Sequence, residues 1–508
     1  MGRTLIATED TGRRRSDASG SPGRATTFLP VGRSKSIVSC IRQDLSARPL
    51  RVGIVGGGPG GLFTAWHLER LASAPLEITI FEASERLGGK VFTSSFAAAP
   101  VRYEAGAAEL YDYSPVDDDP LRGLVRALGL PTVPLAGSAV HVHGNRIANL
   151  DDAATVLGPE GRNGWLAFDA WARSAMTPRE FYESGADHAA SAAPHGRFDA
   201  ALEAACPRSA RGYVEALIHS DLATEPVTTT SGYGLQNYLM NDPAYMRLYR
   251  IAGGNEQLFT AIAARLSARV RRATPVTHVA GGPRAPLTIG WRHAGEPRED
   301  VFDVVILALP IEPLARLTFT DATLKTAIAR HIAHHDHPAH YLRVTLLLDR
   351  PVAGVPGEDD FLMLEAFGGT CLYVESGRDP TARHGVLGLL LGGEAAAAMA
   401  GESDATLVAA AIGALPQCLG IGSRQVLEAR VHRWVGAVSA APGGWKPLPV
   451  DRRHRPSPAH PNLFVVGDYL FDSTLNGVLD SADHVAGWLA ATLAGSPLDA
   501  SHPTENFA

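Results

Sequence analysis

A glycine-rich turn between a predicted strand and a predicted helix constrains this chain more than any other feature. Residues 50–55 (LRVGIV) are typical of a buried strand, and residues 60–71 carry apolar side chains at helical spacing. The turn between them reads GGGPGG, a GxGxxG arrangement. Such glycines permit a tight turn, close approach of a pyrophosphate to the backbone, and close packing of the helix. With a second predicted strand over 77–82, the segment forms a βαβ unit of a parallel, dinucleotide-binding sheet.

The end of the second predicted strand indicates which dinucleotide is bound. Glu82 lies 26 residues after Gly56, placed to accept hydrogen bonds from ribose hydroxyls. A carboxylate there disfavours the 2′-phosphate of NADP, which leaves NAD or FAD. The text EASERLGGK then adds two glycines and two cations, Arg86 and Lys90. This addition can hold a second stretch of pyrophosphate and flavin, which an NAD dehydrogenase does not need, so the sequence favours FAD.

Segments in a fixed order over about residues 50–495 resemble the flavin amine oxidase superfamily, which includes monoamine, polyamine and L-amino acid oxidases, phytoene desaturases and protoporphyrinogen oxidases. The matching text is the glycine turn, EASERLGGK, YEAGAAE (103–109), IAGGNEQL (251–258), PV (275–276), LALP (307–310), FVVGD (464–468) and NGV (476–478). The resemblance implies that FAD is bound by Gly56, Gly58, Pro59, Gly60, Gly61, Glu82, Ala83, Arg86, Gly89, Lys90, Gly106, Ala107, Ala108, Val276, Gly467, Asp468, Asn476, Gly477 and Val478.

The same resemblance implies how the cofactor lies and how it is held. The Val276 backbone should touch the adenine end, Asp468 should lie near the pyrophosphate and ribityl chain, and residues 476–478 should lie beneath the isoalloxazine. The family usually has Glu at the position of Asp468. Aspartate is shorter, and it can hold the ribityl chain through a water molecule. Monoamine oxidases carry flavin on a cysteine near the C-terminus, and the corresponding stretch here, 435–442, has none. We therefore expect non-covalent FAD.

Three departures from the family pattern concern the substrate. Val438 and Thr474 stand where two aromatic residues often sandwich the amine. Glu109 stands where L-amino acid oxidases place an arginine for the substrate carboxylate, so we expect it to meet a cationic or hydrogen-bond-donating group. Arg343 best matches a family lysine that is water-linked to flavin N5, and it can supply charge but accept no proton near neutral pH. Glu109 and Arg343 are the candidate catalytic residues; the alternatives are an internal ion pair for Glu109 and a surface or ion-paired position for Arg343.

The order of predicted elements indicates an α/β fold: a Rossmann-type FAD-binding domain built from discontinuous segments, an α+β substrate domain and a helical insertion. Further buried strands are predicted over 301–309 and 462–466, and a further helix over 481–493. The predicted divisions are a disordered tail (1–49), the FAD-binding domain (50–119, 252–310 and 431–495), a mostly helical insertion (120–251), the substrate-binding domain (311–430) and a second tail (496–508). For residues 1–49, a mis-assigned start codon is an alternative explanation.

The composition argues against several classes of function. With 46 basic and 53 acidic residues the net charge is −7, so nothing in the balance attracts nucleic acid or an anionic membrane. No stretch reaches the roughly 18 apolar residues of a membrane-spanning helix. Four cysteines without CxxC spacing indicate a reducing compartment, and we expect a cytoplasmic protein. A metal is an alternative use for His331, His334, His335, His337 and His340, but only Asp336 offers a nearby carboxylate, and we assign no metal.

These observations predict an FAD-dependent oxidoreductase. We expect an amine or amino acid oxidase of specialised metabolism that transfers hydride from a C–H next to nitrogen to flavin N5, with O2 as electron acceptor. The oligomeric state is left open, a homodimer being one possibility. One alternative is a desaturase or C–C dehydrogenase, because GDY at 467–469 also resembles the phytoene desaturase ending. A non-catalytic flavin-fold carrier, like the GDP-dissociation inhibitors, is disfavoured by the intact glycine turn.

Overall fold

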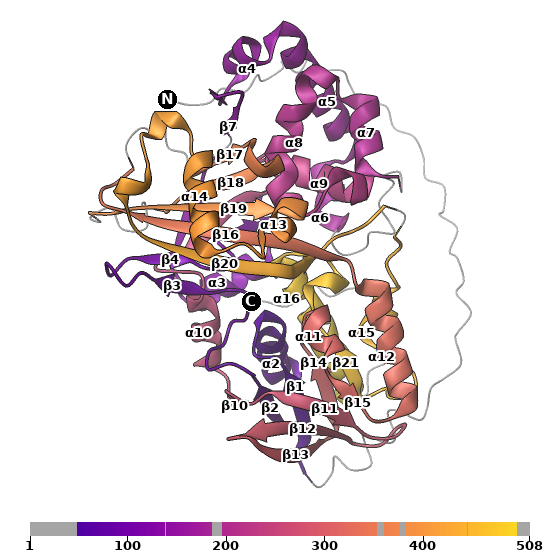
Figure 1. The fold of residues 1–508 in the computed structure, drawn as a ribbon. Helices are drawn as coiled ribbons and strands as arrows, with labels where there is room; N and C mark the ends of the chain where they lie inside the picture. The colour runs from indigo at the N-terminus through magenta and orange to yellow at the C-terminus, as the bar shows by residue number, and fades with distance from the viewer. Residues whose placement is uncertain are drawn as a thin grey trace, which may run out of the picture.

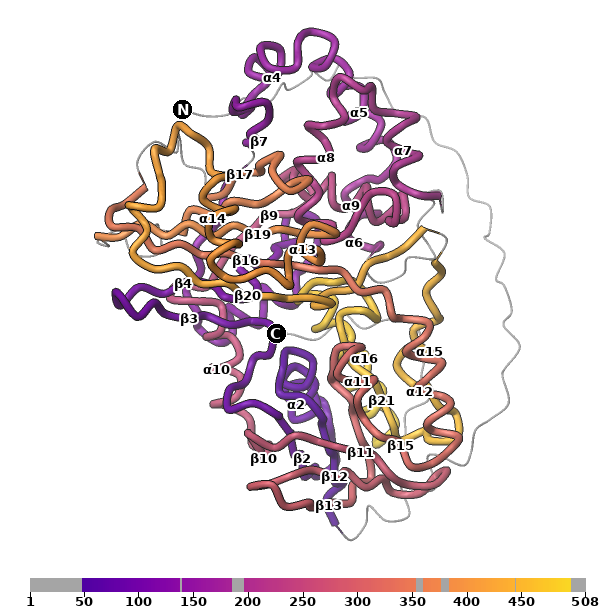
Figure 2. Tube along the Cα trace, in the orientation of Figure 1, coloured from indigo at the N-terminus to yellow at the C-terminus, as the bar shows by residue number. Residues whose placement is uncertain are grey.

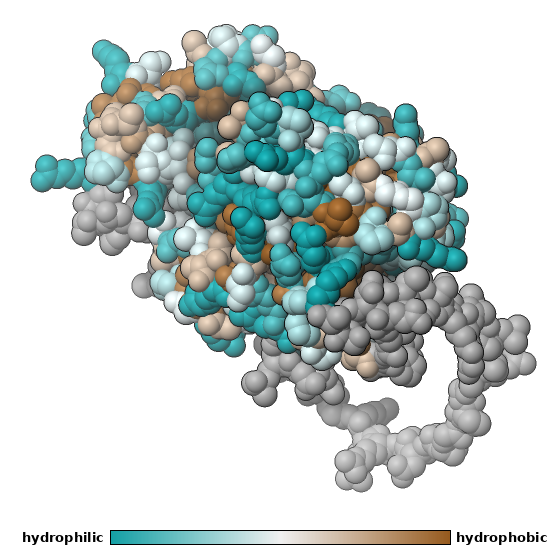
Figure 3. Space-filling model, turned by 90° about the horizontal axis from the view of Figure 1, so that it is seen from below, coloured by the Kyte–Doolittle hydropathy of each residue, from teal (hydrophilic) through white to brown (hydrophobic). Residues whose placement is uncertain are grey.

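The computed structural model describes residues 48–137, 139–184, 196–352, 360–375, 383–443 and 445–494. The tails predicted at 1–49 and 496–508 lie outside these ranges, apart from residues 48 and 49. Figure 1 shows a region built on a parallel sheet at the lower end of the view and a larger mixed sheet above it, with a group of helices beyond. Viewed from below in Figure 3, the described surface is mainly hydrophilic, with apolar side chains in small patches.

The parallel sheet is assembled from segments far apart in the sequence. Its order is β10 (Arg269–Arg271), β2 (Leu76–Phe81), β1 (Leu50–Val55), β14 (Val304–Leu307) and β21 (Leu463–Val465), all parallel. The turn after β1 leads into α2 (Pro59–Leu71), so the predicted βαβ unit is confirmed. Helices α2 and α16 (Leu475–Ala494) pack together against one face of this sheet. The Rossmann-type domain predicted from the sequence is therefore present.

A four-stranded sheet covers the other face of the parallel sheet. It consists of β13 (Glu296–Phe302), β12 (Leu287–His293), β11 (Val276–Ala280) and β15 (Thr318–Phe319). The buried strand predicted over 301–309 is present as β14 (Val304–Leu307), but its predicted bounds are wrong, because residues 301 and 302 belong to β13 in another sheet. Between them the Asp303 carboxylate accepts a hydrogen bond from the Arg51 amide (2.8 Å) and pairs with Arg48. β14 is fully buried, whereas β13 is mostly exposed and buries only Phe302 at its end. The apolar residues of 301–309 lie on both sides of Asp303, so an apolar run alone does not reveal the break between two sheets.

The second region is built on a seven-stranded mixed sheet. Its order is β20 (Val426–Ser439), β16 (Pro338–Leu348), β19 (Gly385–Gly392), β18 (Thr370–Val374), β17 (Phe361–Leu364), β7 (Ala139–Val142) and β8 (Asn145–Ile147). Helix α8 (Arg208–Leu222) packs on one face, and α13 (Gly393–Met399) and α14 (Asp404–Ala414) lie over the other, where their side chains join the same core. The predicted domain boundary at residue 431 falls inside β20.

The segment predicted as a mostly helical insertion is helical in its middle and contributes strands at both ends. Near its ends, β6 (Thr132–Leu135) and β9 (Arg247–Ile251) pair in a small sheet with β5 (Leu110–Asp112). Its other helices are α3 (Pro120–Ala127), α4 (Leu150–Val156), α5 (Gly158–Ala175), α6 (Pro178–Ser184), α7 (Phe198–Ala205) and α9 (Ser231–Leu239). The remaining strands and α-helices of the described ranges are a hairpin of β3 (Thr93–Ser95) and β4 (Arg102–Glu104), and α10 (Gln257–Ala263), α11 (Ile311–Ala315), α12 (Ala322–His335) and α15 (Val450–His454).

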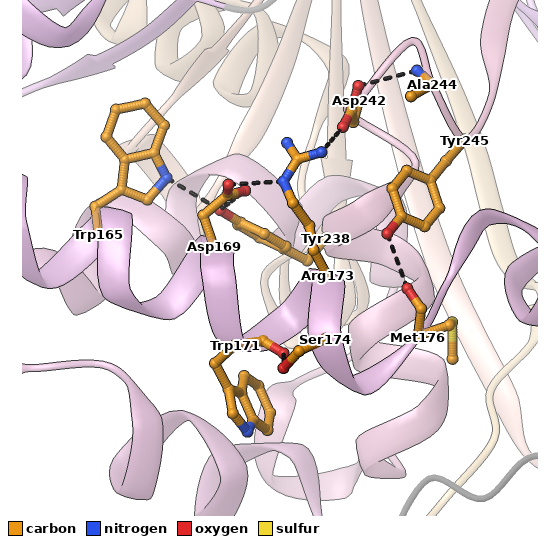
Figure 4. A network of polar contacts seen from close by, with 10 residues as sticks. All are labelled: Trp165, Asp169, Trp171, Arg173, Ser174, Met176, Tyr238, Asp242, Ala244 and Tyr245. Carbon is orange, nitrogen blue, oxygen red and sulfur yellow. Dashed lines mark hydrogen bonds and ion pairs between the residues drawn. The ribbon is translucent and has the colours of Figure 1, made fainter. Parts of the chain in front are cut away.

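A polar network ties α9 to α5, as Figure 4 shows. The Trp165 indole donates to the Tyr238 hydroxyl (3.0 Å), and that hydroxyl donates to Asp169 (3.1 Å). Arg173 donates to the same Asp169 carboxylate (2.7 Å) and also pairs with Asp242 just beyond α9. Because charge-assisted contacts hold both the helix and the turn that follows it, α9 has a defined position against α5.

Two histidines of α12 are buried without hydrogen-bond partners among the described residues. His331 and His335 are 4% and 2% exposed, and their rings lie 4.6 Å apart beside Tyr469 and Trp445. Burial first, and then the neighbouring histidines, lower the pKa of His331 to about 4 and that of His335 to about 2. In the described part of the chain no group of three or more His, Cys, Asp or Glu residues is arranged to hold a metal ion. Both imidazoles are therefore neutral core side chains.

We predict that these two histidines make the protein sensitive to acid. A folded pKa below the ordinary value means that the unfolded chain binds more protons, so stability is full above about pH 6.5 and falls as the pH decreases toward the folded pKa. The loss amounts to at most about 1.4 kcal/mol per pH unit for each group. His335→Leu should therefore show a smaller decrease of thermal midpoint between pH 7.5 and pH 5 than the wild type. The exposed His293→Leu is the control, and an equal pH dependence in both variants would contradict the assignment.

Candidate active site

A cavity of about 2430 Å³ extends from the glycine turn after β1 to the space between α8, α9 and the seven-stranded sheet. In Figure 2, the C-terminal segment that leads into α16 lies between the parallel-sheet region and the mixed sheet. Residues of both regions, for example Gly56 beside the parallel sheet and Tyr373 of the mixed sheet, line the cavity. Its position at the carboxyl end of the parallel strands is where open α/β sheets bind ligands.

The glycine turn leaves no space for side chains at two positions and open space at a third. A Cβ on Gly56, whose φ is +110°, would lie 2.3 Å from the Ala308 carbonyl oxygen, and one on Gly61 would lie 1.9 Å from the Gly56 carbonyl oxygen. A Cβ on Gly58 would meet nothing closer than Gly89 Cα, at 3.7 Å, and both glycines line the cavity. The turn thus packs α2 tightly against β1 and keeps its own cavity side open.

The N-terminus of α2 at this turn suits an anion. Gly58 is its N-cap and provides no side-chain hydrogen bond, Pro59 follows, and the first turn carries no acidic residue. Free N–H groups and the helix dipole at such an end favour negative charge, as in a phosphate. The open space at Gly58 is therefore an anion cradle.

The Glu82 carboxylate is held in place at the edge of this cradle. One oxygen accepts a hydrogen bond from the Gly57 amide (2.8 Å), and the other accepts from the Ser84 amide (2.8 Å) and hydroxyl (2.7 Å). Glu82 also lines the cavity. An oriented carboxylate beside a phosphate cradle is the arrangement that binds the ribose of a dinucleotide.

The two cations of the predicted flavin segment have different surroundings. The Arg86 guanidinium donates to the Gly89 carbonyl and lies 4.2 Å from the centre of the Phe92 ring, so it shapes the loop. The Lys90 ammonium lines the cavity, donates to the Ala437 carbonyl and lies 3.4 Å from an Asp468 oxygen. Lys90 thus links the end of β20 to the cofactor side of the cavity.

Most of the predicted cofactor residues line this single cavity. Those that line it are Gly56, Gly58, Pro59, Gly60, Glu82, Gly89, Lys90, Gly106, Ala107, Ala108, Gly467, Asp468, Asn476 and Val478. Those that lie behind the lining are Gly61, Ala83, Arg86, Val276 and Gly477. Val276 belongs to β11, where it pairs with Trp291. Contact between its backbone and the adenine stays a prediction.

The start of α16 provides an unpaired acceptor on the cavity wall. The Asn476 amide nitrogen donates to Asp119 (3.2 Å), whereas its Oδ1 is buried and has no partner among the residues described. A buried, unsatisfied acceptor is costly unless a ligand supplies a donor. The open cradle, the oriented Glu82 and the free Asn476 oxygen together fit a flavin dinucleotide.

At the other end, the cavity closes on two acidic residues. Glu109 accepts a hydrogen bond from the Tyr373 hydroxyl (2.8 Å), and Asp221 of α8 lines the same wall. Burial raises the pKa of Glu109. Burial, and then the charge of Glu109, raise the pKa of Asp221 well above its ordinary value. This end of the cavity therefore favours a bound cation or hydrogen-bond donor.

Aromatic side chains surround Glu109 and Asp221, although the two positions that are often aromatic in the family, Val438 and Thr474, are not aromatic here. Val438 and Thr474 line the cavity, as expected from the alignment. The aromatic side chains come from other elements: Tyr111 of β5, Tyr233 of α9, Tyr341 of β16, Tyr373 of β18 and Trp434 of β20. Sequence analysis missed Asp221 and these residues, because no motif surrounds them and only the fold brings them together.

Two arginines that could form an internal ion pair with Glu109, Arg102 and Arg122, bind other groups. Arg102 donates to the Gly253 carbonyl (3.1 Å), and Arg122 pairs with Asp112 (3.4 Å) and stacks on Tyr249. An ion pair of Glu109 with either arginine is therefore not formed. Arginine pairing does not explain why an acid occupies this wall.

Arg343 does not line the cavity. It is fully buried in β16, pairs with Glu375, and its guanidinium carbon lies 4.9 Å from the centre of the Tyr373 ring. A surface position for Arg343 is wrong, and the ion-paired alternative is the one observed. Arg343 can therefore affect the cavity in two indirect ways. It can fix the position of the Tyr373 ring, and its charge can act electrostatically on Glu109.

The helices of the described ranges include none long and apolar enough to cross a membrane.

Comparison with known proteins identifies the family. The family model described as flavin containing amine oxidoreductase matches residues 59–488. Prenylcysteine oxidase 1 of Mus musculus is 32% identical over 100 residues, which are 20% of this chain and 18% of that protein. Probable polyamine oxidase 4 of Arabidopsis thaliana is 30% identical over 109 residues, 22% of this chain and 20% of that protein. The chain therefore matches about a fifth of the length of these curated relatives.

Solved structures show the same fold. Putrescine oxidase bound to putrescine has a TM-score of 0.65 at 18% identity, covering 87% of this chain and 99% of that one. Cyclohexylamine oxidase from Brevibacterium oxydans has a TM-score of 0.66 at 18% identity, covering 88% of this chain and all of that one. The resemblance predicted from the sequence motifs is confirmed. The match over residues 59–488 shows that this chain belongs to the flavin-containing amine oxidoreductase family.

Proposed function

We propose that this protein is an FAD-dependent oxidase of a small amine with a second polar group, a specialised substrate rather than a simple amino acid. The observation that carries the proposal is one continuous cavity that joins the phosphate cradle at Gly58 to the acidic pocket at Glu109 and Asp221. FAD, when bound, would accept at N5 a hydride from the carbon next to the substrate nitrogen. We propose O2 as the final electron acceptor.

The protein's own residues would hold and orient the amine. Tyr111, Tyr233 and Tyr341 supply rigid apolar surface that excludes water from the inner cavity. Glu109, oriented by the Tyr373 hydroxyl, would bind a cationic or donor group away from the reacting carbon. Fixing one end of a substrate in this way positions the other end for reaction.

The acidic pocket disfavours two alternatives. A free α-carboxylate beside Glu109 would be a buried like-charge contact that costs several kcal/mol (~2–5), so a simple amino acid oxidase fits poorly. A polyene substrate of a desaturase would leave the carboxyl groups of Glu109 and Asp221 without partners in an apolar contact. The open cradle at Gly58 argues against a carrier that has lost its cofactor.

We also propose that the FAD is non-covalent and the protein cytoplasmic. Residues 435–442 contain no cysteine, although Ala437 and Val438 line the cavity. Of the cysteines in the described ranges, Cys206, Cys371 and Cys418, none lines the main cavity. Cys40, the fourth, lies outside those ranges. The cysteine usage, without CxxC spacing, supports a reducing compartment.

Glu82→Ala should weaken FAD binding. Charge-assisted hydrogen bonds from ribose hydroxyls contribute about 1.5–3 kcal/mol, so Kd should rise roughly 10-fold to 150-fold. Bound flavin is measured as the yellow colour that acid precipitation releases into the supernatant. Glu77→Ala, at an exposed position of β2, the strand that ends just before Glu82, is the matched control. Full flavin content in Glu82→Ala would refute the ribose assignment, and flavin that stays with the pellet would refute non-covalent binding.

Glu109→Gln should impair substrate binding and leave the fold intact. Gln keeps the shape and can still accept from Tyr373, whereas it loses the charge that attracts a cation. We expect KM for a cationic amine to rise about 10-fold to 150-fold, in line with the loss of one charge-assisted hydrogen bond of about 1.5–3 kcal/mol. Glu160→Gln, exposed on α5, serves as control. An unchanged KM together with a lower thermal midpoint would show that Glu109 has only a structural role.

A further inference from the structure

Glu109 and Asp221 share a second, smaller cavity behind the main one. Both residues line it, together with Met240, Met363 and Cys371, and its volume is about 10 Å³. A water molecule needs about 10–15 Å³ of such space, so at most one water fits there. The two acidic residues therefore share a space with room for no more than one water, and each also lines the main cavity.

The pair has no cation of its own. Within the described structure, the residues that line the small cavity include no lysine, arginine or histidine. Arg343 is the cation that acts on Glu109, but it is paired with Glu375 and lies behind the Tyr373 ring. Glu109 receives one hydrogen bond, from Tyr373, and no donor to the Asp221 carboxylate is found among the described residues. Two carboxylates in such surroundings do not both ionise easily.

The tyrosines and the thiol that face Glu109 and Asp221 do not change the charge of the pocket. Burial raises the pKa of each neighbouring tyrosine and of the neighbouring thiol, so these groups stay neutral. The groups, by element, are Tyr111 of β5, Tyr233 of α9, Tyr341 and Arg343 of β16, and Cys371 and Tyr373 of β18. The charge of the pocket in the free enzyme therefore depends on the protons that Glu109 and Asp221 hold.

We propose that Glu109 and Asp221 hold one proton between them in the free holoenzyme and release it to solvent when a cationic group of the substrate binds. The charges balance: the free pair carries −1, and the doubly ionised pair with a bound monocation also carries −1. The inference rests on the proposed function, because that function supplies the cationic ligand. The inference adds a pH dependence. Over the pH range in which the free pair holds its proton, the dissociation constant of the substrate should fall by up to tenfold for each unit by which the pH rises.

Calorimetric titration of the holoenzyme with n-butylguanidinium tests this proposal. The guanidinium charge is fixed, so the probe brings no titrating proton of its own. Binding heats at pH 7, measured in two buffers with different ionisation enthalpies, give the number of protons released. We expect between about 0.5 and 1 proton per bound probe in the wild type. Asp221→Asn should lower this number toward zero, whereas Asp151→Asn, exposed on α4, should leave it unchanged.

An infrared measurement on the wild type covers the case in which Asp221→Asn does not fold. The carbonyl stretch of a protonated carboxyl should be present in the free holoenzyme and lost when the probe binds. Failure of the probe to bind, or binding without proton release and without loss of this band, would overturn the proposal. These outcomes are distinct from failure of the proposed function, which would appear as a flavin that no amine reduces.

Discussion

The structure depends on a backbone contact that only glycine permits. Gly61 approaches the Gly56 carbonyl so closely that any side chain would overlap it, and Gly56 itself has a positive φ. This contact joins α2 to β1 and directs the helix N-terminus toward the cavity. β2 belongs to the same βαβ unit as β1, whereas β10, β14 and β21 come from distant segments, and all five parallel strands end at the same edge of the sheet. The cofactor residues can therefore converge although they are spread from residue 56 to residue 478.

A second set of contacts connects the cofactor side with the mixed sheet. Lys90 donates to the Ala437 carbonyl of β20, and the Trp434 indole of the same strand donates to the Ala105 carbonyl (2.7 Å). These bonds hold β20 against the loop that carries Gly106 to Glu109. The acidic pocket thus lies at the inner end of the same cavity as the anion cradle. The proposed chemistry requires this continuity, since the amine must be held while its neighbouring carbon faces the cofactor.

The features of the fold and the site that depend on residues close together in the sequence could be predicted, and those that depend on tertiary contacts could not. The βαβ unit and Glu82 followed from periodicity and glycine spacing, because their physical requirements lie within about thirty consecutive residues. The break at Asp303 was not predictable, since apolar residues lie on both sides of it, at the end of β13 and throughout β14. Asp221 and Tyr373 were missed because their roles arise from tertiary contacts between α8, β18 and the loop at Glu109. Glu109 itself was identified only through the family resemblance, and its surroundings needed the structure.

Anaerobic titration of the purified holoenzyme, followed by flavin absorbance, tests the central claim most directly. The panel would contain amines with a second cationic group, amino acids with a free α-carboxylate, and polyenes. The account predicts that the amines reduce the flavin and that the amino acids and polyenes do not. Reduction by a polyene or a simple amino acid, with no reduction by any amine, would contradict the assignment of the acidic pocket as the site that binds the substrate's cationic group.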